Sequence, residues 1–422
     1  MPAFKRSPVA VPSGASAATG GSAALLVLLM WGAYFQNYTD RQAVFSMFPV
    51  LRTDLGLSDE QLGLTGSIFL WVYGACCPLA GQLADRCSKR VMVVLSLVLW
   101  SVVAFATGLV QSAFMLLALR AAMGISESLY MPAAIALTAN AHPPEKRSRA
   151  IAILTTAQIF GTVGGAWFGG WMAERGHWRE AFFVLGGVGV LYAIPYFFFL
   201  RRINEEAEVE TRRTRSRLAV LDLVRIPSYV VLCIVFPVFV FGLWLLYGWL
   251  PSFLHDKFEL GLADAAFTAT AYLQAATLVG MLLGGFLADR LYRRTRAARM
   301  WVLLASVWLC APCLYALGYG ESLAAVRWAA MGFGLASGLL MGNIFPAAFE
   351  IVPADARASA VGILNFCGAL VSGFAPLLGG AWRQTLGIDA LLGGTAVAYL
   401  LAGGLLLVGT RRWFERDFER IR

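Results

Sequence analysis

Twelve stretches of predominantly apolar residues, separated by polar, proline or glycine turns, fill the chain from residue 23 to residue 410. A helix that crosses the hydrocarbon core of a bilayer needs about 20 such residues, and each stretch is long enough. Of all residues, 59% are hydrophobic and 14% are charged, whereas a soluble globular chain carries about 25% charged residues. A soluble protein is therefore excluded, and the sequence predicts an all-α membrane protein with twelve transmembrane helices. We place these helices at 23–50, 61–84, 90–110, 112–140, 148–173, 179–200, 228–254, 266–289, 299–318, 321–350, 357–381 and 388–410.

The basic residues indicate how these helices are oriented. If both termini face the cytoplasm, 26 of the 34 Lys and Arg residues fall on that side and five on the other, as the positive-inside rule requires. This placement accounts for the net charge of +9 without a nucleic-acid partner. The compact loops and the lack of a transit peptide favour a bacterial inner membrane. The expected segments are a disordered cytoplasmic tail at 1–22, an N-terminal half at 23–200, a cytoplasmic linker at 201–227, a C-terminal half at 228–410 and a cytoplasmic tail at 411–422.

Several function classes find little support in the sequence. The Gly-x-x-x-x-Gly-Lys-Ser/Thr loop of ATP-driven proteins is absent from the chain. No histidine lies within a predicted helix and no nucleophile–base pair stands out, which argues against an enzyme. Cys310-Ala-Pro-Cys313 has the spacing of metal ligands, but there is no second pair, so we expect neither a metal nor a cofactor.

An internal repeat divides the chain into two halves. Gly81-Gln-Leu-Ala-Asp-Arg86 follows the second predicted helix and Gly285-Phe-Leu-Ala-Asp-Arg290 follows the eighth. Arg120-Ala-Ala-Met-Gly124 is echoed in Arg327-Trp-Ala-Ala-Met-Gly332 at a nearly identical offset. Matches at the same ordinal helices predict two pseudo-symmetric six-helix halves of the same orientation. A binding site between two such halves is typical of alternating-access transporters.

These residues also carry a family resemblance. The loop from Gly81 to Arg90 resembles the signature loop of the major facilitator superfamily, although Cys87 and Ser88 depart from its usual aromatic residue and glycine. The chain further resembles the anion:cation symporter branch, which includes hexuronate, galactonate and tartrate importers and the animal sialic acid and phosphate carriers. The motifs that carry this second resemblance are Asn37-Tyr-Thr-Asp-Arg41, Arg120 with Glu127, Trp178-Arg-Glu-Ala-Phe182 and Trp249-Leu-Pro-Ser-Phe253. The first of them is also similar to spinster-like lipid transporters.

Two arginines inside predicted helices are the leading candidates for substrate binding. Arg41 and Arg120 lie at similar depth outward of the membrane centre, and two planar guanidinium forks from neighbouring helices would clamp one carboxylate or phosphate group. The resemblance supports this role, since the branch uses matching arginines for its anion. Alternatively, each arginine pairs with a local acid and holds the helices together. Arg327, the counterpart of Arg120, lies nearer a helix start, where snorkelling to the interface is expected.

Neutral polar and aromatic residues at the same depth would surround the anion with further donors and acceptors. Packing or an interfacial belt is the alternative for each aromatic residue among them. The candidates are Tyr34, Asn37, Tyr38, Tyr73, Gln158, Trp244, Tyr247, Tyr272, Asn343 and Asn365.

Two carboxylates inside the helices are candidates for proton coupling. Glu127 lies two helical turns after Arg120, near the predicted membrane centre. An anion bound to the arginine would weaken the hold of the arginine on this carboxylate and favour proton uptake. A fixed arginine–glutamate pair is the alternative. Asp40 cannot share the helix face of Arg41, and it is either a second titrating group or a helix-pairing group.

The two signature loops supply candidate gating residues. A carboxylate at a loop can cap the positive amino end of a facing helix and so close the cytoplasmic mouth. The alternative is that these charges only set topology. The candidates are Gly81, Asp85, Arg86, Arg90, Asp289 and Arg290.

Together these features predict a secondary active transporter, a proton-coupled symporter of a small organic anion such as a sugar acid or carboxylate. The expected partners are this substrate, protons and the lipid bilayer, with the protein acting as a monomer. Two alternatives remain open: a spinster-like transporter of lysolipid or another amphiphile, and a transporter-derived ligand sensor.

Overall fold

The computed structural model describes residues 20–84, 87–201, 223–353 and 356–421, and every regular element within these ranges is a helix. Residues 1–19 of the predicted N-terminal tail, most of the linker and the two loop residues Asp85 and Arg86 therefore lie outside the described residues. The first half comprises α1 (Gly20–Ser46), α2 (Phe48–Leu55), α3 (Asp59–Ala84), α4 (Lys89–Thr107), α5 (Ala113–Ser128), α6 (Tyr130–Ala141), α7 (Pro144–Glu174) and α8 (Trp178–Leu200). The second half comprises α10 (Pro227–Phe258), α11 (Leu262–Tyr292), α12 (Ala298–Tyr319), α13 (Leu323–Phe349), α14 (Arg357–Ser372), α15 (Phe374–Trp382), α16 (Ile388–Arg412) and α17 (Phe414–Glu419).

Three predicted helices are divided in the structure, at Met47, Leu129 and Gly373. Pro49, Pro132 and Pro376 follow these breaks by two or three residues. A proline has no N–H to donate to the carbonyl four residues earlier, so the helical ladder is interrupted there. Prolines inside α3, α8, α10, α12 and α13 leave those helices continuous, so proline permits such a break without forcing it.

Length and hydropathy fit membrane crossing in most of the described part of the chain. Eleven segments there are long and apolar enough to span a bilayer, with α5 and α6 forming one span and α14 and α15 contributing to another. Helix α1 is not among them. It carries Gln36, Asn37, Asp40, Arg41 and Gln42. These polar side chains lower its mean hydropathy, and Asn37, Asp40 and Arg41 among them belong to the polar site described below.

The two halves pack alike. In the first half, α1 packs against α7, α3 against α5 and α4 against α8. Counted as membrane spans, these are the pairs first with fifth, second with fourth and third with sixth. The same pairs recur as α10 with α14, α11 with α13 and α12 with α16. Hydrogen bonds repeat as well, because the Tyr192 hydroxyl donates to the Leu29 carbonyl (2.8 Å) and the Tyr399 hydroxyl to the Phe239 carbonyl (2.6 Å). The predicted repeat is thus present in the packing.

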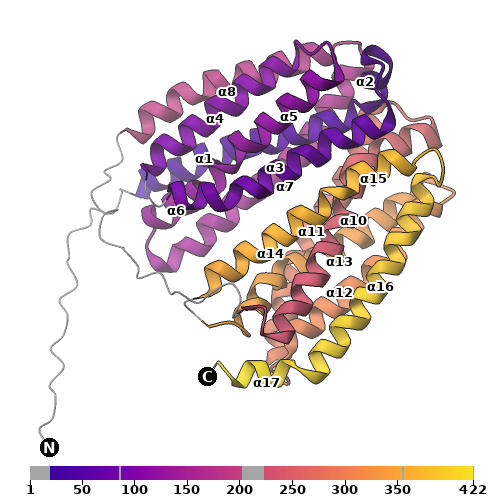
Figure 1. The fold of residues 1–422 in the computed structure, drawn as a ribbon. Coiled ribbons are helices and arrows are strands. Elements are labelled where there is room, and N and C mark those ends of the chain that lie inside the picture. The colour runs from indigo at the N-terminus through magenta and orange to yellow at the C-terminus, as the bar shows by residue number, and fades with distance from the viewer. Residues whose placement is uncertain (1–19, 85–86, 202–222, 354–355, 422) are drawn as a thin grey trace, which may run out of the picture.

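Figure 1 shows the two bundles side by side, with the end of α8 and α17 at one end of the molecule and α2 at the other. We call these the terminal end and the far end. The halves meet closely toward the far end: a Cβ on Gly63 of α3 would lie 2.2 Å from the Pro376 carbonyl oxygen, and one on Gly170 of α7 would lie 2.5 Å from that of Leu262. No larger residue fits either position without movement of the backbone.

Small residues on α7 also bring α1 close. Gly161, Gly165 and Gly169 lie directly against the α1 backbone at Phe35, Thr39 and Ala43. Such a stripe permits close helix packing in a membrane, where small side chains let two backbones approach. It fixes the position of the α1 segment that carries Asp40 and Arg41.

Candidate functional site

Four ionisable side chains form a buried cluster within the first half. Asp40 and Arg41 come from α1, and Arg120 and Glu127 come from α5. None of the four is more than 4% exposed. The Arg41 Nε donates to the Glu127 Oε2, which ties α1 to α5 through an ion pair. Arg120, seven residues before Glu127 on the same helix, is not the partner in this pair.

Aromatic rings surround the two guanidinium groups. The Arg41 Cζ lies 4.8 Å from the Tyr38 ring centroid, 4.6 Å from that of Tyr73 and 4.9 Å from that of Phe69. The Arg120 Cζ lies 5.0 Å from the same Phe69 ring. Sequence reasoning missed Phe69, although it lies one helical turn before Tyr73 on α3 and therefore shares its face. The Phe69 ring thus contacts both guanidinium groups, so the two arginines lie next to one residue of α3.

The cluster is incompletely paired. Among the described residues, the Arg120 Nη2, the Glu127 Oε1 and both carboxylate oxygens of Asp40 have no hydrogen-bond partner, although all are buried. Arg120 makes one long bond, from Nε to the Thr65 carbonyl (3.4 Å), and Asp40 lies within electrostatic range of Glu127 and Arg120. Buried polar groups in folded proteins are nearly always bonded. The cluster therefore holds both a buried donor and buried acceptors that have no partner among the described residues.

A cavity of about 340 Å³ lies between the halves, lined by α7 on one side and by α10, α11 and α13 on the other. Gln158 and Tyr247, both predicted from the sequence, line it. The Tyr247 hydroxyl accepts from the Gln274 Nε2 (2.8 Å), and the Gln158 Oε1 accepts from the Tyr34 hydroxyl (3.4 Å). Because the Tyr34 ring packs edge-on against that of Tyr38 (5.1 Å), a path of side chains joins the cavity wall to Arg41.

The other predicted substrate contacts are dispersed. Asn37 is buried one turn before Arg41, and the Trp244 ring lies 5.7 Å from that of Tyr247. Tyr272 packs instead under the guanidinium of Arg327 (5.4 Å). The remaining two are apart from the cluster: the Asn343 Nδ2 donates to the Leu339 carbonyl of its own helix (2.9 Å), and Asn365 is exposed on α14.

The predicted gating residues lie at the terminal end where they are described. Gly81 faces open space, and the Arg90 Nη1 donates to the Leu200 carbonyl (3.1 Å). The Asp289 Oδ1 pairs with the Arg299 Nη2 (3.3 Å), and Arg299 also pairs with Glu350. Burial raises the pKa of the Glu350 carboxyl, although Arg299 opposes this shift. Asp289 therefore bonds within its own half in this conformation.

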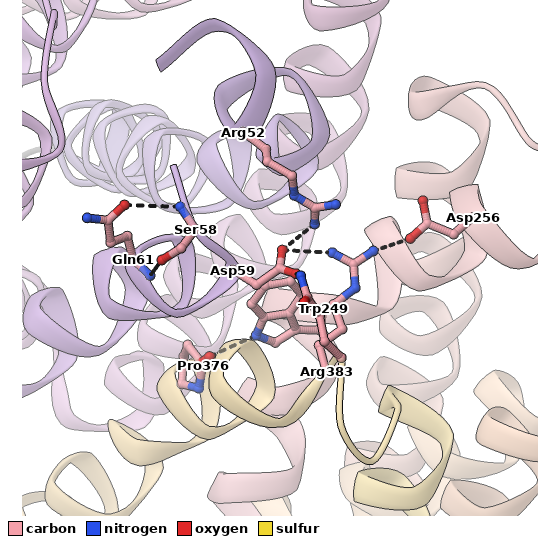
Figure 2. Close-up of polar contacts among 9 residues, drawn as sticks. Arg52, Ser58, Asp59, Gln61, Trp249, Asp256, Pro376 and Arg383 are labelled. Atoms are coloured by element: carbon pink, nitrogen blue, oxygen red, sulfur yellow. Dashed lines mark hydrogen bonds and ion pairs between the residues drawn. The ribbon is translucent and has the colours of Figure 1, made fainter. Parts of the chain in front are cut away.

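A second charged network, which the sequence did not reveal, joins the two halves at the far end. Figure 2 shows Asp59 at the start of α3 between Arg52 of the first half and Arg383 of the second, with Asp256 on the other side of Arg383. The Asp59 Oδ2 also accepts from the Gln384 Nε2 (3.2 Å). Nearby, the Trp249 Nε1 donates to the Pro376 carbonyl (2.8 Å), and the Arg383 Cζ lies 5.4 Å from the Trp249 ring.

We expect Arg383→Gln to open the far end. The substitution removes the ion pair with Asp59, which joins the halves, as well as the pair with Asp256 of the same half. A bond to a charged group contributes roughly 1.5 to 3 kcal/mol, so loss of the pair with Asp59 should raise the ratio of open to closed far end about tenfold. Spin labels at the exposed positions Glu60 and Thr385 would report a longer inter-half distance. Arg175→Gln is the matched control, because the Arg175 side chain bonds to Trp171 one turn earlier and has no ion pair with another described residue. Unchanged distances in Arg383→Gln would contradict a gating role.

The sequence pattern of the Major Facilitator Superfamily matches residues 30–376 of this chain. The chain belongs to that superfamily. The major facilitator fold explains the two matched halves and the cavity between them, and the protein is an integral, multi-pass membrane transporter rather than an enzyme.

Known members of the superfamily resemble the chain over most of its length. A probable sulfoacetate transporter, SauU, of Cupriavidus necator is 32% identical over 63% of this chain and 65% of that protein. An MFS-type efflux pump of Mycolicibacterium smegmatis is 27% identical (92% and 90% covered), and a hexuronate transporter of Bacillus subtilis is 25% identical (90% and 91%). A solved structure of a bacterial homolog of the human lysosomal transporter Spinster, inward-facing and occupied, superimposes with a TM-score of 0.81 at 20% identity, covering 95% of this chain and 99% of that one. The likeness confirms the predicted fold.

Proposed function

We propose that this major facilitator is a proton-coupled symporter of a small organic anion. The observation that carries the proposal is the buried, incompletely paired cluster of Asp40, Arg41, Arg120 and Glu127. Charges at this depth are costly in a membrane and mark substrate and proton pathways. The names of two relatives, a sulfoacetate and a hexuronate transporter, support an anionic substrate.

In the proposed cycle, Arg41 and Arg120 receive the anionic group, and Glu127 takes up the coupled proton. Arg41 holds Glu127 in the present conformation. An anion that occupied Arg41 would leave the Glu127 carboxylate without its cation, and a proton would then neutralise it at the least cost. Asp40, which has no donor among the described residues, is the second proton-binding group of the proposal.

The orientation follows from the same proposal. With both termini in the cytoplasm of a bacterial cell, the far-end network would close the periplasmic side, and the cavity would belong to an inward-facing state. The lining fits this direction, because it runs along α7 from Gln158 back to Arg149 near the terminal end.

Uptake into proteoliposomes tests the proposal. An inward proton gradient should drive accumulation of radiolabelled galacturonate or sulfoacetate, and a protonophore should abolish it. Galactose is the matched control, because it keeps the ring and hydroxyl groups but lacks the carboxylate. Equal uptake of galactose, or accumulation that survives the protonophore, would exclude a proton:anion symporter.

One observation favours a second candidate, a transporter of an amphiphile. The cavity hydroxyls of Thr155, Thr156 and Thr277 bond to backbone carbonyls of their own helices, while aliphatic side chains such as Leu243, Leu278 and Met341 line the same space. Such a wall suits an acyl chain better than a polyol. Lysophosphatidylcholine that blocks galacturonate binding competitively at micromolar concentration would favour this candidate.

A further inference from the structure

We propose that a pocket on the outer face of α11 and α12, at the terminal end, binds the phosphate headgroup of an anionic phospholipid. We call it the α11–α12 pocket. Its volume is about 440 Å³, and Arg290, Arg294 and Trp301 line it together with apolar side chains. The pocket contains none of the residues of the buried cluster or of the cavity between the halves, although Arg290 is also one of the candidate gating residues. The inference therefore does not depend on the proposed substrate.

Two unpaired guanidinium groups give the pocket its charge. Arg290 is in the last turn of α11, Arg294 follows the helix end, and both are exposed. In the part of the chain that the structure describes, neither side chain has an ion-pair partner, because the neighbouring Asp289 pairs with Arg299 and Glu419 pairs with Arg296. Two arginines that share one pocket match the charge and the oxygens of a phosphate group.

Topology alone does not explain this arrangement. Positive charge is expected at a cytoplasmic loop and at a helix carboxyl end, and Arg293 and Arg296 satisfy both conditions. Only Arg290 and Arg294 of this segment line the pocket, with the indole of Trp301 on α12. Tryptophan is enriched where a bilayer meets water, so the pocket lies at headgroup level.

An exposed apolar surface continues from the pocket toward the middle of the membrane. Leu287 lines the pocket and is 45% exposed, and Leu283, one turn earlier on α11, is 43% exposed. On α12, Ala305 lines the pocket and Leu309, one turn later, is 53% exposed. This surface would lie along the acyl chains of a lipid whose headgroup fills the pocket, which favours a phospholipid over free phosphate as the occupant. Basic pockets between transmembrane helices are known to recognise anionic headgroups.

Lipid titration of the purified full-length protein tests the proposal, with binding followed by native mass spectrometry. Phosphatidylglycerol should bind more tightly than phosphatidylcholine. The Arg290→Gln/Arg294→Gln double variant should bind phosphatidylglycerol about 30-fold more weakly, since each basic residue contributes to attraction of an anionic lipid. Arg294→Gln alone, which removes a side chain that has no hydrogen bond or ion pair with another described residue, should weaken binding about fivefold and serves if the double variant does not fold.

The matched control is Arg293→Gln, which removes the same charge from the same turn but leaves the pocket intact. It should bind phosphatidylglycerol as the unmodified protein does. An equal loss of affinity in Arg293→Gln, or equal binding of phosphatidylcholine, would overturn the site. Arginine-dependent binding of inorganic phosphate without any such binding of phosphatidylglycerol would overturn the lipid as its occupant.

Discussion

Glu127→Gln is expected to bind and exchange substrate but to lose accumulation driven by a pH gradient. Glutamine has nearly the shape of the protonated acid and still accepts a hydrogen bond from Arg41 through its carbonyl oxygen, yet it cannot release a proton. Exchange of labelled for unlabelled galacturonate across a vesicle membrane needs no net proton movement, so it should continue. The measurement compares exchange with gradient-driven uptake in the same proteoliposomes.

Asp40→Asn is the informative comparison for this experiment. Asp40 lies in the same buried cluster but makes no ion pair with a described residue, so its substitution removes a proton site and leaves the Arg41–Glu127 pair intact. Full pH-driven accumulation by Glu127→Gln, with loss in Asp40→Asn, would transfer the coupling role to Asp40. Loss of exchange as well in Glu127→Gln would show that the pair with Arg41 is structural.

The twelve helices and their two halves could be predicted because the bilayer imposes a length and a hydropathy on each span. The breaks at Met47, Leu129 and Gly373 could not, since proline is tolerated inside many membrane helices and only the packing decides where the ladder is interrupted. Helix α1 shows a further limit of hydropathy. The polar residues that identify the site also lower the mean hydropathy of α1, so hydropathy alone does not mark this helix as a span.

The candidate site was predictable where charge within a helix is itself the signal. Arg41, Arg120, Asp40 and Glu127 stand out for that reason, and the structure brings all four together. The ion pair between Glu127 and Arg41 forms because α1 approaches α5. No sequence pattern within either helix predicts this approach.

The far-end network was hidden for a different reason. Arg52 and Arg383 are more than 300 residues apart in sequence, and both lie outside the predicted membrane helices, among the five basic residues on the less positive side. Arg52 and Asp59 pair within the first half, but the ion pair between Arg383 and Asp59 exists only because the halves pack together, and a pattern within one half does not encode that interface.

Arg120→Lys is expected to weaken substrate binding about 10- to 100-fold while leaving the thermal stability of the protein nearly unchanged. Lysine keeps the positive charge but cannot offer the planar fork that bonds a carboxylate with two parallel N–H groups, and a bond to a charged group contributes roughly 1.5 to 3 kcal/mol. Because Arg120 makes one long bond to the Thr65 carbonyl, its loss should affect affinity far more than folding.

The same substitution at two other arginines separates binding from structure. Arg41→Lys should weaken binding to a similar extent and also lower stability, because Arg41 carries the ion pair to Glu127. Arg327→Lys is the matched control: Arg327 occupies the place of Arg120 in the repeat but packs over Tyr272, so affinity should not change. Isothermal titration of galacturonate and sulfoacetate into the three purified variants measures each effect. Unchanged affinity in both Arg41→Lys and Arg120→Lys would exclude the clamp. A loss of affinity in Arg327→Lys equal to that in Arg120→Lys would instead place the anion between the halves, in contact with the second half as well.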